Sequence, residues 1–329
     1  MKIEPLVSIV TINYNGLSDT CELLDTIPVA DTVETIVVDN GSREDEASVI
    51  EQRYPHVTVV RSDENLGFAG GNNLGIRASH GRYIFLVNND TLLDGDNDDP
   101  TAQGSTDVSS CNFFQPLIDR LESSPTIGMV CPKLRFSWDS RPIQFAGYTP
   151  LSSITLRNSA IGCGEEDHGQ YDVAHPTPYA HGAAMLVKRE AIDRAGLMPE
   201  CYFLYYEELD WSVMMTRAGY EIWYDHCRTV FHKESQTTGQ GSTLRTYYIS
   251  RNRLLFARRN IKMPRRLLTC CYLVCVVATR DICRHLIHGA WGHVKAVCRG
   301  VRDGIVGAGP VPARFDVYGQ THASSPFRG

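Results

Sequence analysis

The sequence contains no run of 18 or more apolar residues, so it predicts no transmembrane helix. The nearest candidate, residues 267–279, is too short to span a bilayer. Arg265 and Arg266 precede this stretch, and Arg280 and Arg284 follow it. The pattern suits an interfacial helix on anionic lipid, and a core helix packed on the main domain fits it equally well.

Regular cysteine spacing is also missing. The chain has 11 Cys, an odd number, and no CxxC pair. This argues against both a disulfide framework and a zinc site. The N-terminus shows no secretory h-region, so we expect reduced thiols in a cytoplasmic protein. If the basic C-terminal part contacts lipid, the protein works at the inner face of the cell membrane.

Two common nucleotide-binding motifs are absent. There is no GxGxxG after the first apolar run and no GxxxxGK[ST], which argues against a Rossmann dinucleotide site and a P-loop NTPase. The net charge of −6 over 329 residues argues against a nucleic-acid partner.

The charge is nevertheless uneven along the chain. Residues 88–110 hold six Asp and no Lys or Arg, whereas residues 245–302 are rich in Arg. We expect residues 94–112 to form an exposed loop inserted near the site. The Asp cluster resembles the start of a calcium loop but lacks its closing Glu, so we do not favour a calcium site.

Apolar runs alternate with helical segments through residues 6–90. The pattern predicts strands at 7–12, 35–38, 57–60 and 83–87, and helices at 18–26, 43–53 and 69–79. Such alternation indicates right-handed βαβ units, hence an α/β fold with a mostly parallel central sheet flanked by helices. Further on we expect helices at 113–123, 189–195, 206–218 and 244–260, and strands at 127–132, 180–188, 221–224 and 229–232.

Polar residues follow three of these strands. They are Asn13-Tyr14-Asn15-Gly16, Asp39-Asn40-Gly41-Ser42 and Asn88-Asn89-Asp90. Ligands bind at the carboxyl ends of parallel strands, so these residues suggest one crevice for a sugar nucleotide and a metal. Oxygen ligands favour Mg²⁺ or Mn²⁺. Each segment alone is equally explained by an Asx turn.

Two segments contain small residues that leave room for a ligand. Residues 65–73 (Asn-Leu-Gly-Phe-Ala-Gly-Gly-Asn-Asn) open a helix with three glycines, which allow close approach to backbone N–H groups. His181-Gly182-Ala183-Ala184-Met185 begins another apolar strand. For Ala184 and Met185 we prefer simple strand packing.

Tyr205-Tyr206-Glu207-Glu208-Leu209-Asp210-Trp211 places three carboxylates within four positions, which repel one another unless a function compensates. On a helix, Glu207 and Asp210 share a face and Glu208 points elsewhere. One of the three would be a general base with a raised pKa. His232, after an apolar pair, is either a metal ligand or a structural histidine.

In this order, the segments resemble family 2 glycosyltransferases of the GT-A fold, especially the bacterial rhamnosyltransferase-like branch. The resemblance covers about residues 6–260. The segments that carry it are Val7–Gly16, Val37–Ser42, Asn65–Gly75, Asn88–Asp90, His181–Met185, Tyr205–Trp211 and Arg251-Asn252-Arg253. It implies an inverting transfer of a sugar from a nucleotide diphosphate to a hydroxyl.

The resemblance also implies roles for single residues. Asp90 would hold the metal together with His232, and Asn88 would lie near the ribose or diphosphate. Glu208 occupies the position of the base, where the family usually has Asp, and Asp210 is the reserve. Asp39 would bind the nucleoside. The expected donor-binding set is Thr11, Asn13, Asn15, Asp39, Asn65, Gly67, Asn88, Asn89, Gly182 and Ala183.

We therefore expect a transferase domain at residues 1–260, a basic helical extension at 261–303 and a disordered tail at 304–329. The donor would be dTDP-rhamnose or another UDP- or dTDP-sugar. The acceptor would be a glycan or a lipid-linked glycan of the cell surface. One rival is a non-catalytic sugar-nucleotide or glycan-binding protein on the same fold. The other is a nucleotidyltransferase, which would need a basic, Gly-rich loop after the first strand.

Overall fold

The computed structural model describes residues 5–93, 113–138, 140–234 and 242–307. Its contacts divide the chain into two compact units. The described residues of the first, here the sheet unit, fall within 1–151, 157–203 and 207–234. Those of the second, the helical unit, fall within 152–156, 204–206 and 235–329. The expected acidic loop, its calcium-like Asp cluster and residues 308–329 of the expected tail lie outside the described residues.

A single mixed sheet organises the sheet unit, with the strand order β3-β2-β1-β4-β9-β6-β10-β5. β7 pairs with β6, and β8 pairs with β10. The strands are β1 (Val7–Asn13), β2 (Val33–Asn40), β3 (Thr58–Ser62), β4 (Tyr83–Val87), β5 (Thr91–Leu93), β6 (Ile127–Phe136), β7 (Ile143–Phe145), β8 (His175–Pro176), β9 (Ala184–Lys188) and β10 (Glu221–His232).

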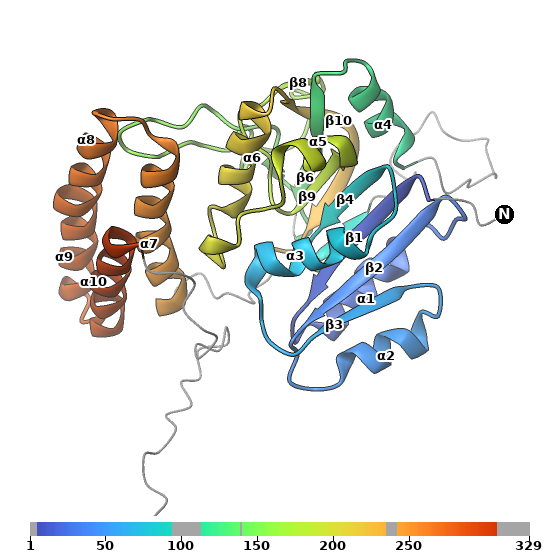
Figure 1. Cartoon of the computed structure of the whole chain (residues 1–329), viewed down its shortest axis with the longest axis horizontal. Coiled ribbons are helices and arrows are strands. Elements are labelled where there is room, and N and C mark those ends of the chain that lie inside the picture. The colour runs from blue at the N-terminus through green and yellow to red at the C-terminus, as the bar shows by residue number, and fades with distance from the viewer. Residues whose placement is uncertain (1–4, 94–112, 139, 235–241, 308–329) are drawn as a thin grey trace, which may run out of the picture. The chain divides into compact units, whose positions relative to one another are not determined.

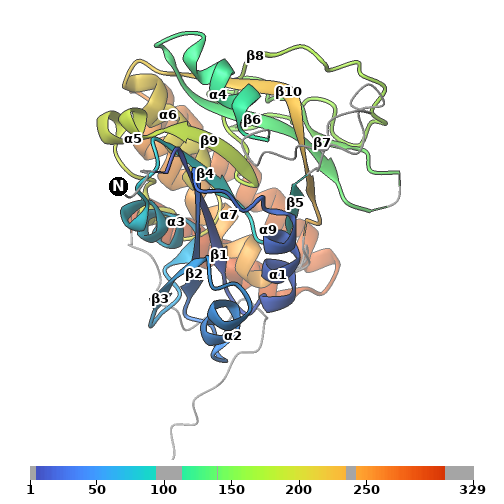
Figure 2. The same cartoon turned by 90° about the vertical axis from the view of Figure 1, so that its right-hand side faces the viewer.

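Helices connect the strands as the alternating pattern predicts. α1 and α2 cover one face of the β1–β3 part of the sheet and α3 covers the other (Figure 2). The helices of this unit are α1 (Leu17–Thr26), α2 (Glu46–Arg53), α3 (Gly67–Ala78), α4 (Gln115–Glu122), α5 (Arg189–Ala195), the 3₁₀ turn η1 (Glu200–Tyr202) and α6 (Glu207–Arg217).

The α/β class is confirmed, and the sheet is parallel where the alternation was read, from β3 to β4. The second half is mixed, because β9 runs antiparallel to both β4 and β6. The two strands expected at 221–224 and 229–232 form one strand, β10, with a register shift between Asp225 and Thr229. β9 begins at Ala184, so residues 180–183 precede the strand.

The glycines of α3 serve close packing on the sheet. A Cβ on Gly75 would lie 2.3 Å from Val10 Cγ1, and one on Gly71 would lie 2.8 Å from Ile12 Cδ1. Both distances are shorter than van der Waals contact, so only glycine lets the helix lie this close to β1. This explains much of the glycine-rich stretch without a ligand.

Helices make up most of the described part of the helical unit (Figure 1). They are α7 (Thr243–Asn260), α8 (Arg265–Tyr272), the π-helical turn η3 (Leu273–Ala278), α9 (Thr279–Ile287) and α10 (Trp291–Val306). α7 and α10 pack closely at Gly300 and Gly304, where a Cβ would lie 2.6 Å from Tyr247 O and 2.8 Å from Arg251 O. α7 thus belongs with the later helices, whereas the sequence grouped it with the sheet. α10 reaches Val306, past the expected start of the tail.

The stretch 267–279 is helical, with apolar residues on both a buried and an exposed face. Leu273 and Val277 are buried, while Leu268 and Val276 remain 59% and 50% exposed. The stretch thus has one buried face and one exposed face, and the buried face packs among the helices of its own unit. Among the described residues, no helix is both long and apolar enough to cross a membrane.

Candidate active site

A carboxylate and an imidazole meet where β4 and β10 end. Asp90 lies three residues beyond β4, and His232 is the last residue of β10. β5 holds them together, because Thr91 pairs with His232 in antiparallel register. Asp90 Oδ1 lies 3.2 Å from His232 Nε2, and both residues are buried. The structure thus brings together the two metal ligands expected from the sequence.

Gln144 fixes the orientation of the His232 ring. Its Oε1 lies 2.9 Å from His232 Nδ1. An amide oxygen only accepts hydrogen bonds, so Nδ1 carries the proton. His232 Nε2 then faces the Asp90 carboxylate at 3.2 Å. An imidazole nitrogen beside a carboxylate oxygen is a pair of donor atoms that suits a divalent metal.

Two further rings extend this cluster. The His181 ring lies 6.3 Å from that of His232 in an edge contact, and Tyr148 stacks on His181 at 6.0 Å. Burial and the neighbouring His232 lower the pKa of His181 to about 3, so its imidazole is neutral at physiological pH. Consistent with this, the Ala183 N–H donates to His181 Nδ1 at 3.1 Å.

Glu208 lies in the first turn of α6, beside the small residues that precede β9. A Cβ on Gly182 would lie 3.8 Å from Glu208 Cγ and 3.6 Å from the Phe68 ring. Burial raises the pKa of the Glu208 carboxyl, as a general base requires. Its charge also helps to raise the pKa of Tyr148, after the larger effect of burial.

The other two carboxylates of α6 face the interior. Glu207 and Asp210 are 3% and 1% exposed. Asp210 Oδ2 accepts a hydrogen bond from the Tyr202 hydroxyl at 2.9 Å. The helix thus presents the three acids as the spacing predicts, with Glu208 apart from the buried pair.

A second polar cluster lies at the ends of β1 and β2. Asn13 and Asp39 are paired in the parallel register, and Asn13 Nδ2 donates to Asp39 Oδ1 at 3.1 Å and to Glu46 Oε2 at 2.8 Å. Ser42 Oγ also donates to Asp39 Oδ1. Asn13 is fully buried, so its contacts position Asp39.

Hydrogen bonds join this cluster to the segment after β4. Asn89 Nδ2 donates to Thr20 Oγ1 at 3.0 Å, and Thr20 Oγ1 donates to Asn13 Oδ1 at 2.7 Å. Gly16 permits the approach, since a Cβ there would lie 2.7 Å from Asn89 Nδ2. Asp39 and the residue before Asp90 therefore belong to one continuous polar network.

Most of the remaining residues of the expected donor set take part in internal hydrogen bonds. The Asn88 N–H donates to Ala183 O at 2.9 Å, which places these two segments side by side. Asn65 Oδ1 accepts from the Gly67 N–H at 2.8 Å, and Gly67 has a φ of +74°. Thr11 Oγ1 is buried without a hydrogen-bond partner, and Asn15 Oδ1 accepts from the Arg43 N–H.

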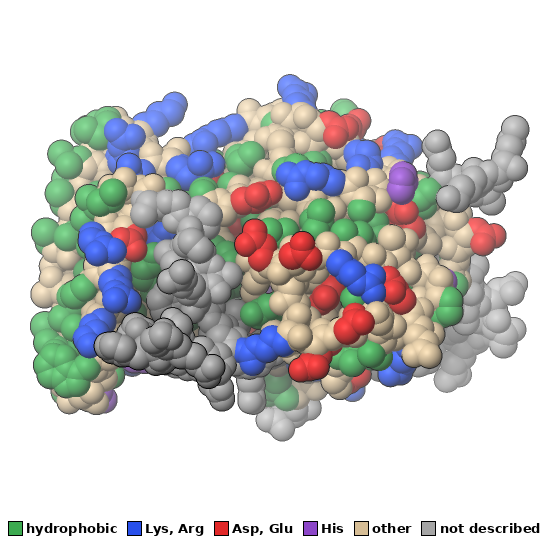
Figure 3. Space-filling model, turned by 60° about the horizontal axis from the view of Figure 1, so that its bottom comes forward, with side chains coloured by type: hydrophobic (Ala, Val, Ile, Leu, Met, Phe, Trp, Pro, Cys, Tyr) green, Lys and Arg blue, Asp and Glu red, His purple; other side chains and the backbone are tan. Residues whose placement is uncertain are grey.

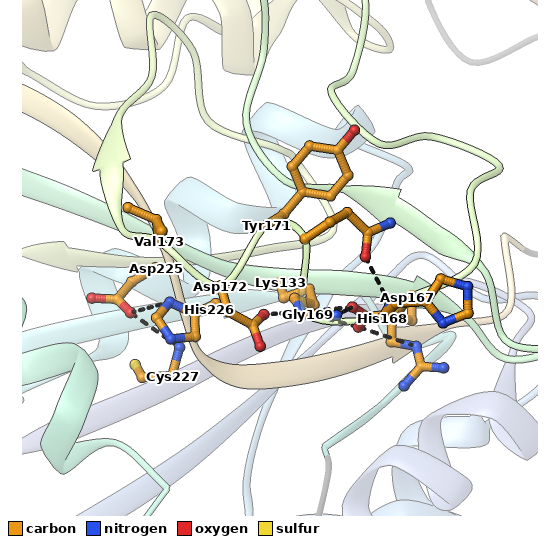
Figure 4. A network of polar contacts seen from close by, with 12 residues as sticks. Lys133, Asp167, His168, Gly169, Tyr171, Asp172, Val173, Asp225, His226 and Cys227 are labelled. Atoms are coloured by element: carbon orange, nitrogen blue, oxygen red, sulfur yellow. Dashed lines mark hydrogen bonds and ion pairs between the residues drawn. The ribbon is translucent and has the colours of Figure 1, made fainter.

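A buried lysine anchors the loop that leads from β7 to β8. Lys133 Nζ on β6 lies 3.0 Å from Asp167 Oδ2 and 2.5 Å from Asp172 Oδ1 (Figure 4). Tyr148 lies near the start of this loop. Gln144, Tyr148 and Lys133 were not expected from the sequence, because they lie on β6 or in the irregular region 135–178. No local pattern marks them.

Few side chains of metal-ligand type lie together at this site. Among the described residues, no group of three or more His, Cys, Asp or Glu side chains is placed to hold a metal ion. Asp90 and His232 form a pair of such side chains. Magnesium-type sites in nucleotide enzymes often have only one or two protein ligands, with substrate phosphates completing the shell. The pair therefore fits a metal that is bound together with a diphosphate.

Comparison with protein families and curated sequences finds similarity to glycosyltransferases. Residues 8–102 match the family model of glycosyl transferase family 2. The hexosyltransferase Agl10 of low-salt glycan biosynthesis in Haloferax volcanii is 26% identical over 254 residues, which cover 76% of this chain and 74% of that protein. An N-acetylglucosaminyl-diphospho-decaprenol L-rhamnosyltransferase of Mycobacterium tuberculosis is 24% identical over 222 residues, which cover 63% and 69%.

Solved structures share the fold. The mannosyltransferase PcManGT of Pyrobaculum calidifontis, in complex with GDP-Man and Mn²⁺, has a TM-score of 0.55 at 16% identity and covers 93% of this chain and 88% of that one. GalNAc-T7, with UDP, GalNAc and Mn²⁺, has a TM-score of 0.55 at 13% identity and covers 79% and 51%. The architecture is that of the GT-A glycosyltransferases.

Proposed function

We propose that this protein is an inverting, metal-dependent hexosyltransferase. The proposal starts from its match to the model of glycosyl transferase family 2. The observation that carries the proposal is the Asp90–His232 pair, connected through the rings of His181 and Tyr148 to the neighbourhood of Glu208. A ligand pair for a diphosphate-bound metal and a carboxylate with a raised pKa are the two parts that such a transfer needs.

The donor would be a UDP- or dTDP-sugar, rhamnose included. Asp39, held by Asn13 and Ser42, accepts hydrogen bonds from the nucleoside, and the hydrogen-bonded path through Thr20 to Asn89 leads from there toward the diphosphate. Asn15 lines the nucleoside side of the site, Asn65 and Gly67 shape the adjoining backbone, and Asn88 lies near the ribose or diphosphate. Thr11, on β1, is fully buried and would support this side of the site from within the fold.

In the transfer step, the acceptor hydroxyl attacks C1 of the sugar on the face opposite the diphosphate. The new C1–O bond forms as the bond from C1 to the phosphate oxygen breaks, which inverts the anomeric centre. Glu208 takes the hydroxyl proton, and the nucleoside diphosphate leaves. Gly182 and Ala183 border the sugar or the acceptor, and the absence of a side chain at Gly182 leaves space beside Glu208.

Asp90 and His232 would hold Mg²⁺ or Mn²⁺, which when bound supplies positive charge that stabilises the departing diphosphate. Gln144 keeps the lone pair of His232 Nε2 directed at this position. Asp210 and Glu207 would keep supporting roles, since both side chains are buried.

The acceptor would be a hydroxyl of a glycan, or of a lipid-linked glycan at the inner face of the membrane, in the synthesis of cell-surface polysaccharide. The helical unit supports this location. Its exposed apolar residues include Leu267 and Leu268, and Arg265 and Arg266 precede them on the same helix. Apolar side chains beside arginines favour peripheral contact with anionic lipid.

A turnover screen tests the function. The purified chain would be incubated with UDP-, dTDP- and GDP-sugars and Mn²⁺ or Mg²⁺, with and without lipid-linked acceptors, while release of nucleoside diphosphate is followed. Turnover of one donor that is lost in Asp90→Ala supports the proposal. Donor binding without turnover under every condition would favour the non-catalytic binding protein instead.

A further inference from the structure

Basic and imidazole side chains surround an open cavity in the helical unit. The cavity has a volume of about 450 Å³, and its walls include Arg245, Arg284, His285, His288 and His293. These residues come from α7, α9, α10 and the turn between α9 and α10. The described residues that line it include no carboxylate. Two guanidinium groups therefore give the cavity a positive charge at neutral pH.

The imidazoles in the walls are held in defined positions. The rings of His285 and His293 stack with their centroids 4.7 Å apart. Thr246 Oγ1 lies 2.8 Å from His293 Nδ1, and His288 Nδ1 donates to Arg284 O at 2.7 Å. A cation would be repelled by the two arginines, and among the described residues the three imidazoles are not placed to hold a metal ion together. The chemistry is that of an anion site.

Exposed apolar side chains lie beside these basic residues in the sequence. Ile287 is 83% exposed next to His288, and Trp291 is 64% exposed one residue after Ala290, which also lines the cavity. Leu286 is 40% exposed. Hydrophobic side chains lie among Lys and Arg side chains on the surface of this unit (Figure 3). Exposed Trp and aliphatic residues around a basic site are typical of contact with the interface of a membrane.

We propose that this cavity binds the phosphate or diphosphate headgroup of a membrane lipid, with Arg245 and Arg284 as its principal ligands. Guanidinium groups form bidentate, charge-assisted hydrogen bonds with phosphate oxygens, and the imidazoles supply further N–H donors. Ile287 and Trp291 would contact the lipid around the headgroup. The inference rests on the membrane location proposed above and is independent of the sugar-transfer reaction.

Vesicle flotation of the full chain tests the proposal. One set of vesicles contains phosphatidylcholine alone, and the other contains phosphatidylcholine with phosphatidic acid, which exposes a phosphate monoester. We expect preferential binding to the second set and competition by free inorganic pyrophosphate in the presence of a metal chelator. Arg284→Gln and Arg245→Gln should each weaken binding about tenfold or more, because each removes charge-assisted hydrogen bonds.

Arg280→Gln is the matched control. Arg280 lies on the same helix as Arg284 but pairs with Asp281 and does not line the cavity. General attraction to an anionic surface is worth about 1 kcal/mol per arginine, so it would weaken binding about fivefold in both variants alike. Equal losses in Arg280→Gln and Arg284→Gln would overturn the proposal.

Two other results would also overturn it. One is equal binding to both vesicle types, which would leave membrane contact without recognition of the headgroup. The other is binding of pyrophosphate without binding of vesicles, which would identify a soluble anion as the ligand. Donor turnover, measured on the same preparations, distinguishes failure here from failure of the transferase assignment, since the cavity lies within the helical unit and Glu208 in the sheet unit.

Discussion

Replacing Glu208 with Gln should lower activity without lowering stability. The amide keeps the size of the side chain but cannot take a proton. General-base catalysis accelerates a reaction by about 10²–10⁴-fold, so the turnover rate should fall by a factor in that range. This fall corresponds to a loss of about 3–5 kcal/mol of transition-state stabilisation. Glu208 is partly buried beside Gly182. Glu207 and Asp210, the other two acids of α6, are buried, so neither is placed to take over as the base.

The effect on stability follows from the raised pKa of Glu208. The native state favours the protonated carboxyl, so ionisation costs nothing below the ordinary pKa of 4.5. The cost grows as the pH rises through the native pKa and is complete above it. The raised pKa of Glu208 therefore makes the native state less stable at neutral pH than it would be with an ordinary carboxyl. Glu208→Gln removes this cost, so its free energy of unfolding at neutral pH should equal or exceed that of the wild type.

The assay combines a pH profile of turnover with denaturant unfolding at neutral pH. Wild-type turnover should fall on the acid side as Glu208 becomes protonated, at a higher pH than an ordinary carboxylate would give, and Glu208→Gln should lose this limb. Asp210→Ala is the control. It removes the carboxylate that accepts a hydrogen bond from the buried Tyr202 hydroxyl and should cost about 1–3 kcal/mol of stability. Near-wild-type turnover in Glu208→Gln, with its acid limb retained, would refute the reasoning.

Three further predictions concern the surroundings of the site. Gln144→Leu should weaken Mn²⁺ binding about 10–100-fold in a metal titration of turnover, because His232 loses the partner that orients it, and unchanged metal dependence would argue against that role. Lys133→Met should cost about 3–5 kcal/mol of unfolding free energy, because it leaves the Asp167 carboxylate buried without its main cation; a loss under 1 kcal/mol would show that the loop is held otherwise. Burial opposes ionisation of Asp167, but Lys133 and the Gly169 N–H bring its pKa below the usual 3.8, so this stabilisation is present above that pH and should disappear in acid. Gly67→Ala should lower the melting temperature, because φ is +74° and the new Cβ would lie 2.3 Å from Phe203 O; an unchanged value would contradict this geometry.

Local sequence patterns were sufficient to predict many of the helices and strands. β4 and α5 have the bounds that their sequences predict, because a run of five apolar residues and a helix ended by Gly196 are both encoded locally. The antiparallel insertion of β9 between β4 and β6 was not predictable, since it depends on pairings across more than 50 residues. The same limit applies to α7, whose place in the helical unit depends on its packing against Gly300 and Gly304.

The expected site residues stand at strand ends or in a cluster of acids, and the resemblance to family 2 glycosyltransferases gave them their roles. Of Asp90, His232 and Glu208, the structure brings the first two into contact. Gln144 and Tyr148 were missed, because each takes part only through contacts with a distant histidine. Asn13 shows the opposite case. It was chosen as a residue lining the donor pocket, but its contacts orient Asp39 from within the fold.

The most direct test of the account is a crystal structure with Mn²⁺ and a nucleoside diphosphate, with diffraction recorded at the manganese absorption edge. The account predicts one anomalous peak at about 2.1 Å from both an Asp90 carboxylate oxygen and His232 Nε2, with diphosphate oxygens completing the shell and the nucleoside at Asp39. A peak away from this pair, or a nucleotide bound far from Asp39, would contradict it.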